Sequence, residues 1–192
     1  MQTIEDGVMA SRFFGIAIAL LQVSNAAAQP TDGPKFEETG KYAGKYFCAP
    51  IAAGGVYWDK TTKEWRGTSF RVSEGEQFVF QTTVGDRMQW EAAGFSVAGI
   101  PYYANVLPLG GSGVACWGAR AAYHPAHLVG HNHIFMSQDG SFHCGTYGGL
   151  YHYAFDLTSG RYMATYYAGF IDGDDSGRNA PSIQIGKCTR IE

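Results

Sequence analysis

Basic clusters and long apolar runs are both missing from most of this sequence. Fourteen lysines and arginines stand against 17 aspartates and glutamates, and they are scattered along the chain. A protein that binds nucleic acid needs several basic side chains to neutralise phosphates, so we expect no nucleic-acid partner. Past residue 28, no stretch approaches the roughly 20 apolar residues that cross a bilayer, which predicts no transmembrane segment in that part of the chain.

Local signatures of catalysis are also missing. No serine stands in a G-x-S-x-G pattern, no glycine-rich phosphate loop occurs, and no two cysteines form a C-x-x-C pair. These patterns are typical of hydrolases, nucleotide-binding enzymes and thiol oxidoreductases. The sequence therefore favours a non-enzymatic role, although a catalytic group assembled from distant residues would leave no such pattern.

The N-terminal residues have the pattern of a secretory signal peptide. Arg12 supplies the positive charge, Phe13–Leu21 form a short apolar core, and Ala26–Ala28 provide a small-residue cleavage site before Gln29. This pattern predicts a protein that is exported to the periplasm or secreted.

The domain organisation follows from this assignment. The two acidic residues that precede the pattern do not suit a signal peptide, so we expect translation to begin at Met9 and the signal to end at residue 28. Residues 29–41 are polar and contain two prolines, which predicts a flexible lead. Residues 42–192 are long enough for one domain with its own core.

All four cysteines lie in the part of the chain predicted to be exported. An oxidising compartment favours disulfides, and four cysteines allow three connectivities. We favour Cys48–Cys188, which would join the first and last strands of the domain, together with Cys116–Cys144, which would close the segment that holds most histidines. Each bridge would add about 2–4 kcal/mol by restricting the unfolded chain.

Aromatic and β-branched residues recur between glycines, while helix signals are scarce. Tyr151, Tyr153 and Phe155 alternate with other residues, and the turn at 158–160 leads into a second alternating run that ends at Phe170. This is the pattern of a hairpin with one aromatic face. The sequence predicts an all-β fold with disulfides, a small antiparallel β-barrel or β-sandwich.

Two long segments lack clean periodicity. Residues 84–115 are broken by glycine and proline, and residues 118–132 hold three histidines. We expect loops or irregular strands in both, and long loops in compact domains often contain the functional residues.

Two predicted turns share a sequence pattern. Trp58–Trp65 and Phe155–Tyr162 both read aromatic, Asp, any residue, Thr, Thr or Ser, any residue, charged, aromatic. One interpretation is a weak internal repeat that makes two similar halves of one barrel or sandwich. The other is that aspartate and threonine suit turns between aromatic strands.

A further set of positions spans most of the predicted domain: Phe47-Cys48, Gly54-Gly55, Trp65, Gly67, Phe70, Arg161-Tyr162-Met163, Tyr166, Gly169-Phe170, Asp172-Gly173, Pro181-Ser182, Gly186 and Cys188. Together they resemble uncharacterised small exported proteins of alphaproteobacteria. The resemblance implies export and a bacterial source, and it brings no activity, substrate or catalytic residue with it.

Five of the six histidines lie in residues 124–143. If residues 131–136 form a strand, His131 and His133 point to the same face, and His143 or a loop histidine could add a third ligand. Three imidazoles with an open fourth position can hold a catalytic zinc. A polar loop that contains histidines needs fewer assumptions, so we expect no bound metal or other cofactor, with zinc as the alternative.

Aromatic residues could also form a ligand site. The candidates are Tyr102 and Tyr103, which lie within the first irregular segment, and Trp117, which lies between the two segments, although aromatic residues on strands are mostly core. The favoured hypothesis is an exported β domain that binds a small ligand, a glycan or another protein. The alternative is a metal-binding protein or metal-dependent hydrolase that uses the histidine-rich stretch, and an envelope structural protein without a ligand is a third.

Overall fold

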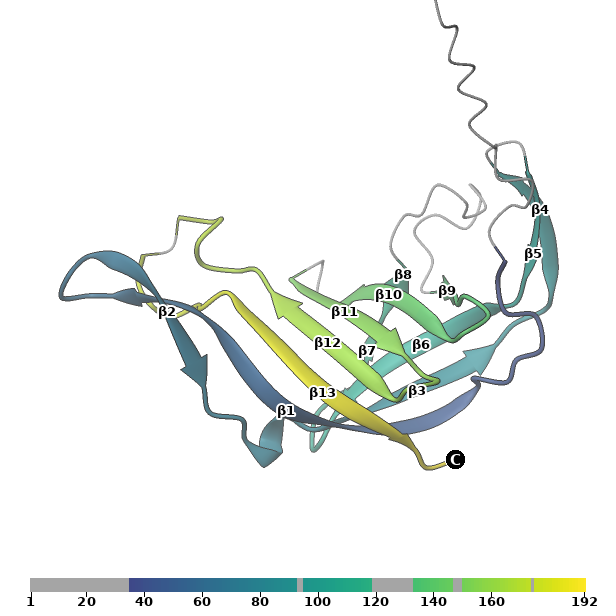
Figure 1. The fold of residues 1–192 in the computed structure, drawn as a ribbon, viewed down its shortest axis with the longest axis horizontal. Coiled ribbons are helices and arrows are strands. Elements are labelled where there is room, and N and C mark those ends of the chain that lie inside the picture. Colours follow the sequence, from purple (N-terminus) through teal and green to yellow (C-terminus); the bar gives the residue numbers. More distant parts are fainter. Residues whose placement is uncertain (1–34, 93–94, 119–132, 147–149, 174) are drawn as a thin grey trace, which may run out of the picture. The chain divides into compact units, whose positions relative to one another are not determined.

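A computed structural model describes residues 35–92, 95–118, 133–146, 150–173 and 175–192 (Figure 1). The chain divides into two units, Met1–Thr31 and Asp32–Glu192, and all described residues belong to the second. Within them no helix has the length and apolarity needed to cross a membrane. The elements are β1 Gly44–Asp59, β2 Glu64–Phe70, the 3-10 turn η1 Glu74–Glu76, β3 Phe78–Val84, β4 Met88–Ala92, β5 Phe95–Gly99, β6 Pro101–Pro108, β7 Val114–Ala115, β8 Trp117–Gly118, β9 His133–Phe135, β10 Ser141–Thr146, β11 Tyr151–Asp156, β12 Arg161–Tyr166 and β13 Ser182–Arg190.

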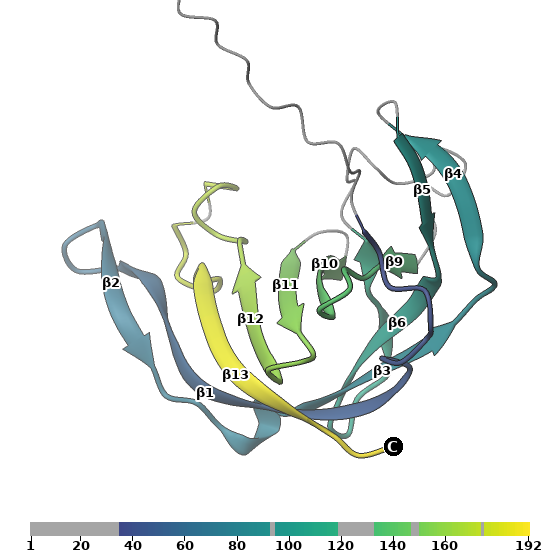
Figure 2. The same ribbon diagram turned by 45° about the vertical axis from the view of Figure 1, so that its right-hand side comes forward.

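The main sheet is a nearly closed antiparallel barrel. Its strands follow the order β7-β6-β3-β1-β13-β12-β11-β10-β8, so successive barrel strands are neighbours and the first long strand pairs with the last. The two views of the ribbon show this sheet curving round on itself (Figure 2). The predicted all-β fold is confirmed, as a barrel.

One short segment of the chain reaches from one edge of the sheet to the other. β7 pairs with β6 at one edge of the sheet, and β8 pairs with β10 at the other edge. One residue, Cys116, separates these two strands, and its backbone N–H donates to Ala104 O in β6 at 2.8 Å. The same stretch of chain therefore connects both edges of the sheet.

Both disulfides lie on this ring of strands. Cys48 and Cys188 are direct partners in the β1–β13 ladder, with Cα atoms 4.0 Å apart. Cys116 is bonded to Cys144 of β10, with Cα atoms 5.4 Å apart. These are the two pairings that the sequence analysis favours.

Aromatic rings fill the barrel interior. Phe80 stacks on Phe155 at 4.3 Å between ring centroids and on Phe142 at 5.3 Å, so residues from β3, β10 and β11 meet in the centre. Successive side chains of a strand point to opposite faces, and the side chains of β11 that point inward are the aromatic ones. The predicted hairpin with one aromatic face thus provides one wall of the core.

Two hairpins extend from the ring. The second half of β1 continues beyond the barrel and pairs with β2, and β4 pairs with β5 as a separate two-stranded sheet (Figure 1). The expectation of loops or irregular strands over 84–115 is wrong for β4, β5 and β6. In β6 the inward Tyr102 and Ala104 alternate with Tyr103 and Asn105, and this mixture gives no clear contrast between apolar and polar positions.

Residues 35–41, expected to be part of a flexible lead, belong to the fold. Phe36 bridges to Ser137, and Glu37 is 3% exposed, with its N–H donating to Met136 O at 2.9 Å. The Glu37 carboxylate accepts bonds from Thr39 N (2.8 Å), Gly40 N (2.9 Å) and the hydroxyls of Thr39 and Tyr102. Burial alone would raise the pKa of Glu37, but these four bonds together lower it to about 2.

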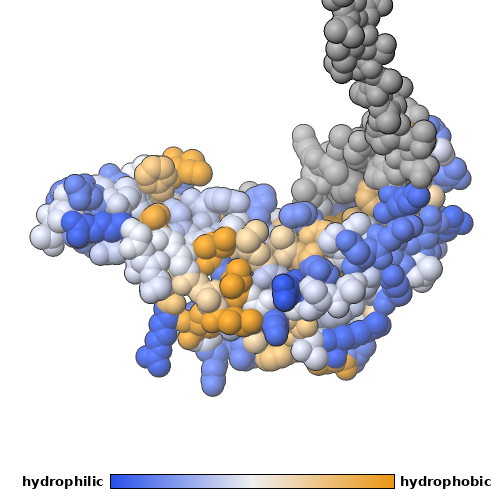
Figure 3. All heavy atoms as spheres, in the orientation of Figure 1, coloured by the Kyte–Doolittle hydropathy of each residue, from blue (hydrophilic) through white to orange (hydrophobic). Residues whose placement is uncertain are grey.

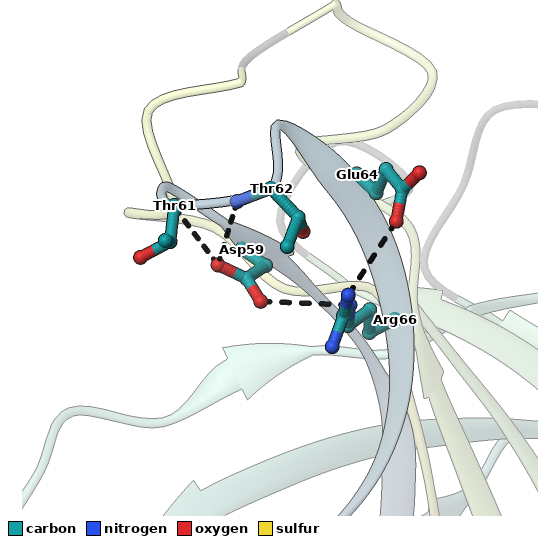
Figure 4. A network of polar contacts seen from close by, with 5 residues as sticks. All are labelled: Asp59, Thr61, Thr62, Glu64 and Arg66. Carbon is teal, nitrogen blue, oxygen red and sulfur yellow. Dashed lines mark hydrogen bonds and ion pairs between the residues drawn. The ribbon is translucent and has the colours of Figure 1, made fainter.

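The two turns that share this sequence pattern also have the same local geometry. Asp59 Oδ1 accepts from Thr61 N (2.8 Å) and Thr62 N (3.2 Å), and the same carboxylate pairs with Arg66 (Figure 4). Asp156 Oδ1 accepts likewise from the N–H groups two and three residues later, both at 3.0 Å. Backbone hydrogen bonds lower the pKa of both aspartates. The similarity is confined to the turns and does not extend to the strands that follow them, because β12 lies within the barrel ring whereas β2 lies beside it.

Lys63 and Gly160 occupy the same position in these two turns, and both have positive φ, 59° and 63°. An L-residue is strained there, so Lys63→Gly is expected to raise the free energy of unfolding by about 0.5–1 kcal/mol.

The reverse change is expected at Gly160. A Cβ on Gly160 would lie 2.5 Å from Cys188 O, so Gly160→Ala should lower the free energy of unfolding by about 2 kcal/mol. Urea unfolding measures both. Lys60→Gly is the control in the turn of Lys63, and an equal gain there would contradict the argument.

Candidate ligand-binding site

One end of the barrel contains a cavity of about 520 Å³. Antiparallel order brings the starts of β3, β11 and β13 to the same end as the finishes of β6 and β12. Residues of these strands and of η1 surround the cavity. The lining residues are Gly75, Glu76, Gln77, Phe78, Val106, Pro108, Leu150, Tyr151, Tyr153, Ala164, Thr165, Tyr166, Ser182 and Gln184.

Strand register places the central lining residues next to one another. Ala164 of β12 lies between its ladder partners Tyr153 in β11 and Gln184 in β13. Ala164 is 7% exposed and carries only a methyl group. A small residue at this position leaves room that a larger side chain would fill.

Aromatic rings form much of the wall. Tyr151 and Tyr166 are cross-strand partners with ring centroids 4.7 Å apart, and Phe78 meets Tyr153 edge to face at 5.8 Å. Rings in such contacts hold each other in position and present flat apolar surface. The wall suits a ligand with a flat, mostly apolar body.

A short chain of hydrogen bonds supplies the polar side of the cavity. Tyr162 donates its hydroxyl hydrogen to Gln184 Oε1 at 3.1 Å, and Gln184 Nε2 donates to Glu76 Oε2 at 2.6 Å. Burial raises the pKa of Tyr162, and Tyr153 and Glu76 raise it further, so this hydroxyl stays protonated and remains a donor. The donor fixes which way the Gln184 amide points.

One buried hydroxyl lies close to the wall. Thr146 is 1% exposed and is the ladder partner of Tyr151, so the two side chains lie on the same face of the sheet. Within the described part of the protein, its Oγ1 has no hydrogen-bond partner.

The interior below the cavity, toward the opposite end, is filled. Tyr46 donates to Tyr42 O at 3.1 Å, and the Tyr42 hydroxyl lies 2.9 Å from Thr158 Oγ1. Tyr102 is fully buried against the Glu37 carboxylate, and burial followed by that hydrogen bond raises its pKa. The cavity therefore has a packed floor.

The three aromatic residues predicted as ligand contacts do not line this cavity. Tyr102 is in the core, while Tyr103 and Trp117 are 41% and 51% exposed on β6 and β8. Neighbouring residues on a strand point to opposite faces, so Tyr102 and Tyr103 cannot share a site.

The structure places two of the three predicted metal ligands. His133, on β9, is 4% exposed, whereas His143 faces outward on β10. His131 lies outside the described residues, as do His124 and His127. Over the described ranges, no three His, Cys, Asp or Glu residues are placed to hold a metal ion. The zinc alternative stays a prediction.

The outer face of the barrel has an apolar patch. Met163 and Ile185 are ladder partners on β12 and β13, and Ile183 and Ile51 add to them, with exposed fractions between 39% and 59%. Hydrophobic residues gather over these strands in the space-filling view (Figure 3).

No pattern in the sequence points to Glu76, Phe78 or Gln184 as lining residues. The aromatic face of the 151–166 hairpin was a usable signal for Tyr151, Tyr153 and Tyr166, but their partners lie far away in sequence. Only the closed order of the strands brings residues 76–78 beside residues 182–184.

Comparison with known proteins adds no family or relative. No protein-family model, curated protein or solved structure matches the chain.

Proposed function

We propose that this protein is a non-enzymatic binding protein that takes a small molecule with a flat, mostly apolar body into the barrel mouth. The observation that supports this most directly is the aromatic-walled cavity of about 520 Å³. Small-molecule sites are typically concave, mainly apolar and a few hundred to about 1,000 Å³ in volume, with a few polar groups that orient the ligand. The Tyr162–Gln184–Glu76 chain supplies such groups.

We infer further that the protein works outside the cytoplasm, in the periplasm or as a secreted protein. The signal-like pattern before Gln29 supports this, and so do the two disulfides, because disulfides persist in oxidising compartments. N-terminal sequencing of the exported protein tests it, with Gln29 as the expected first residue.

Ala164→Trp is expected to block the cavity. The indole would occupy the space beside Tyr153 and Gln184, so the variant should bind the neutral fluorescent probe N-phenyl-1-naphthylamine at least about tenfold more weakly than wild type. Fluorescence titration measures the affinity, and thermal unfolding shows that the variant is folded. Ala164→Leu is the smaller plug if the tryptophan prevents folding.

Met163→Trp is the matched control. It introduces the same tryptophan one residue away, on the outward face of the same strand. Probe affinity should change less than about twofold, since this side chain cannot reach the cavity. Equal binding by the plugged and control variants, or no stoichiometric binding by wild type, would contradict the proposed function.

A further inference from the structure

The carboxylate at the cavity rim is held in place by several donors. Glu76 is exposed, and its Oε1 accepts from Ser73 N (3.3 Å) and Ser73 Oγ (3.2 Å) while its Oε2 accepts from Gln184. Exposed glutamates normally sample many rotamers, and ordering one costs side-chain entropy. Donors on both oxygens, one from the cavity wall, therefore fix a negative charge at the mouth.

The described wall of the cavity holds no positive charge that balances Glu76. Among the described residues that line the cavity, Glu76 is the one with a formal charge at neutral pH, and the other polar lining groups are hydroxyls and amides. The neighbouring Glu74 on η1 is also exposed and adds charge of the same sign close by. The electrostatic field at the mouth therefore favours a cation and disfavours an anion.

The aromatic wall favours the same charge. The faces of Phe78, Tyr151 and Tyr166 carry the negative part of the ring quadrupole, and a cation near such faces is attracted to them. Quaternary ammonium groups are recognised in this way, by several rings around a weakly hydrated charge. Rings and carboxylate thus select together for one kind of ligand.

We propose that the mouth cavity binds organic cations, in which an amine or quaternary ammonium group is joined to an apolar body. The ammonium group lies toward Glu76, and the body packs against the aromatic wall above Tyr153 and Ala164. This inference rests on the proposed function, because it names the chemical class that the same cavity accepts.

Three probes of nearly equal size test it by calorimetry on the whole protein: (4-hydroxyphenyl)trimethylammonium, its neutral isostere 4-tert-butylphenol, and the anion 4-hydroxybenzenesulfonate. The cation is expected to bind about tenfold more tightly than the neutral isostere, and the anion should be weakest. Added salt should weaken cation binding and leave the neutral isostere unchanged.

Glu76→Gln provides the test at the residue. It removes the charge and keeps the shape of the side chain, with one amide oxygen that can still accept from Ser73 or from Gln184, so cation affinity should fall about tenfold while affinity for the neutral isostere changes less than twofold. Glu74→Gln is the matched control, because it removes a nearby charge that does not line the cavity. Its effect on cation affinity should be under about threefold.

The outcomes separate the two proposals. Equal affinity for the cation and the neutral isostere, unchanged in Glu76→Gln, would overturn the cation inference and leave the cavity as a binding site. Failure of all three probes and of N-phenyl-1-naphthylamine to bind would overturn both.

Discussion

A protein in which Cys48 and Cys188 are both alanine is expected to lose about 5 kcal/mol in its free energy of unfolding. The bridge joins residues 140 apart and so removes much conformational entropy from the unfolded chain. It also holds together two strands that are direct ladder partners at the middle of the barrel wall. Guanidinium unfolding under non-reducing conditions measures the loss.

The second disulfide is the matched control. Cys116 and Cys144 are 28 residues apart, so the double alanine variant should lose about 3.5 kcal/mol. All four cysteines are buried, so the small cavities left by the substitutions are similar, and the difference of about 1.5 kcal/mol reports loop length. A larger loss from the short loop would show that fastening the β7–β8 segment matters more than chain entropy.

Glu37→Gln is expected to cost about 3 kcal/mol at pH 7. The carboxylate is buried and accepts four hydrogen bonds, and one amide oxygen cannot accept them all. The figure also follows from linkage, since the pKa of Glu37 is lowered from 4.5 to about 2 and each pKa unit corresponds to about 1.4 kcal/mol. Chemical unfolding at pH 7 measures it.

The sign of the pH dependence gives a second readout. Because the folded-state pKa lies below the unfolded one, this contribution is complete above about pH 4.5 and is lost as the pH falls toward 2. Wild type should therefore lose more stability over that range than Glu37→Gln. Glu38→Gln is the control, as its exposed ion pair with Arg87 should contribute under about 1 kcal/mol. Parallel acid profiles for wild type and Glu37→Gln would contradict the assignment.

The sequence predicts features that depend on local pattern. The alternation of Tyr151, Tyr153 and Phe155 predicts their strand. The sequence pattern that the two turns share predicts their common hydrogen-bond geometry at Asp59 and Asp156. The disulfide pairing could also be anticipated, because Cys48 and Cys188 lie near the two ends of the predicted domain, in its expected first and last strands.

Apart from the disulfides, the features that depend on non-local partners could not be predicted. Glu37 reads as part of a polar lead, because nothing near it in sequence shows that the Tyr102 hydroxyl will meet its carboxylate. The cavity is hidden for the same reason, since Glu76 and Gln184 become neighbours only when β1 and β13 pair. Tyr102 and Tyr103 are chemically alike in sequence, and only the register of β6 decides which one is buried.

The pairing of β1 with β13 has a consequence for biosynthesis. At about 5–20 residues per second, the ribosome needs roughly 7–28 s to make the 140 residues that separate Cys48 from its ladder partner. During that time the inward Tyr46 and its strand have no partner on that side, so the barrel cannot close while the chain is being made. A nascent chain that stays open for this long can still pass through a narrow channel unfolded, as the proposed export would require.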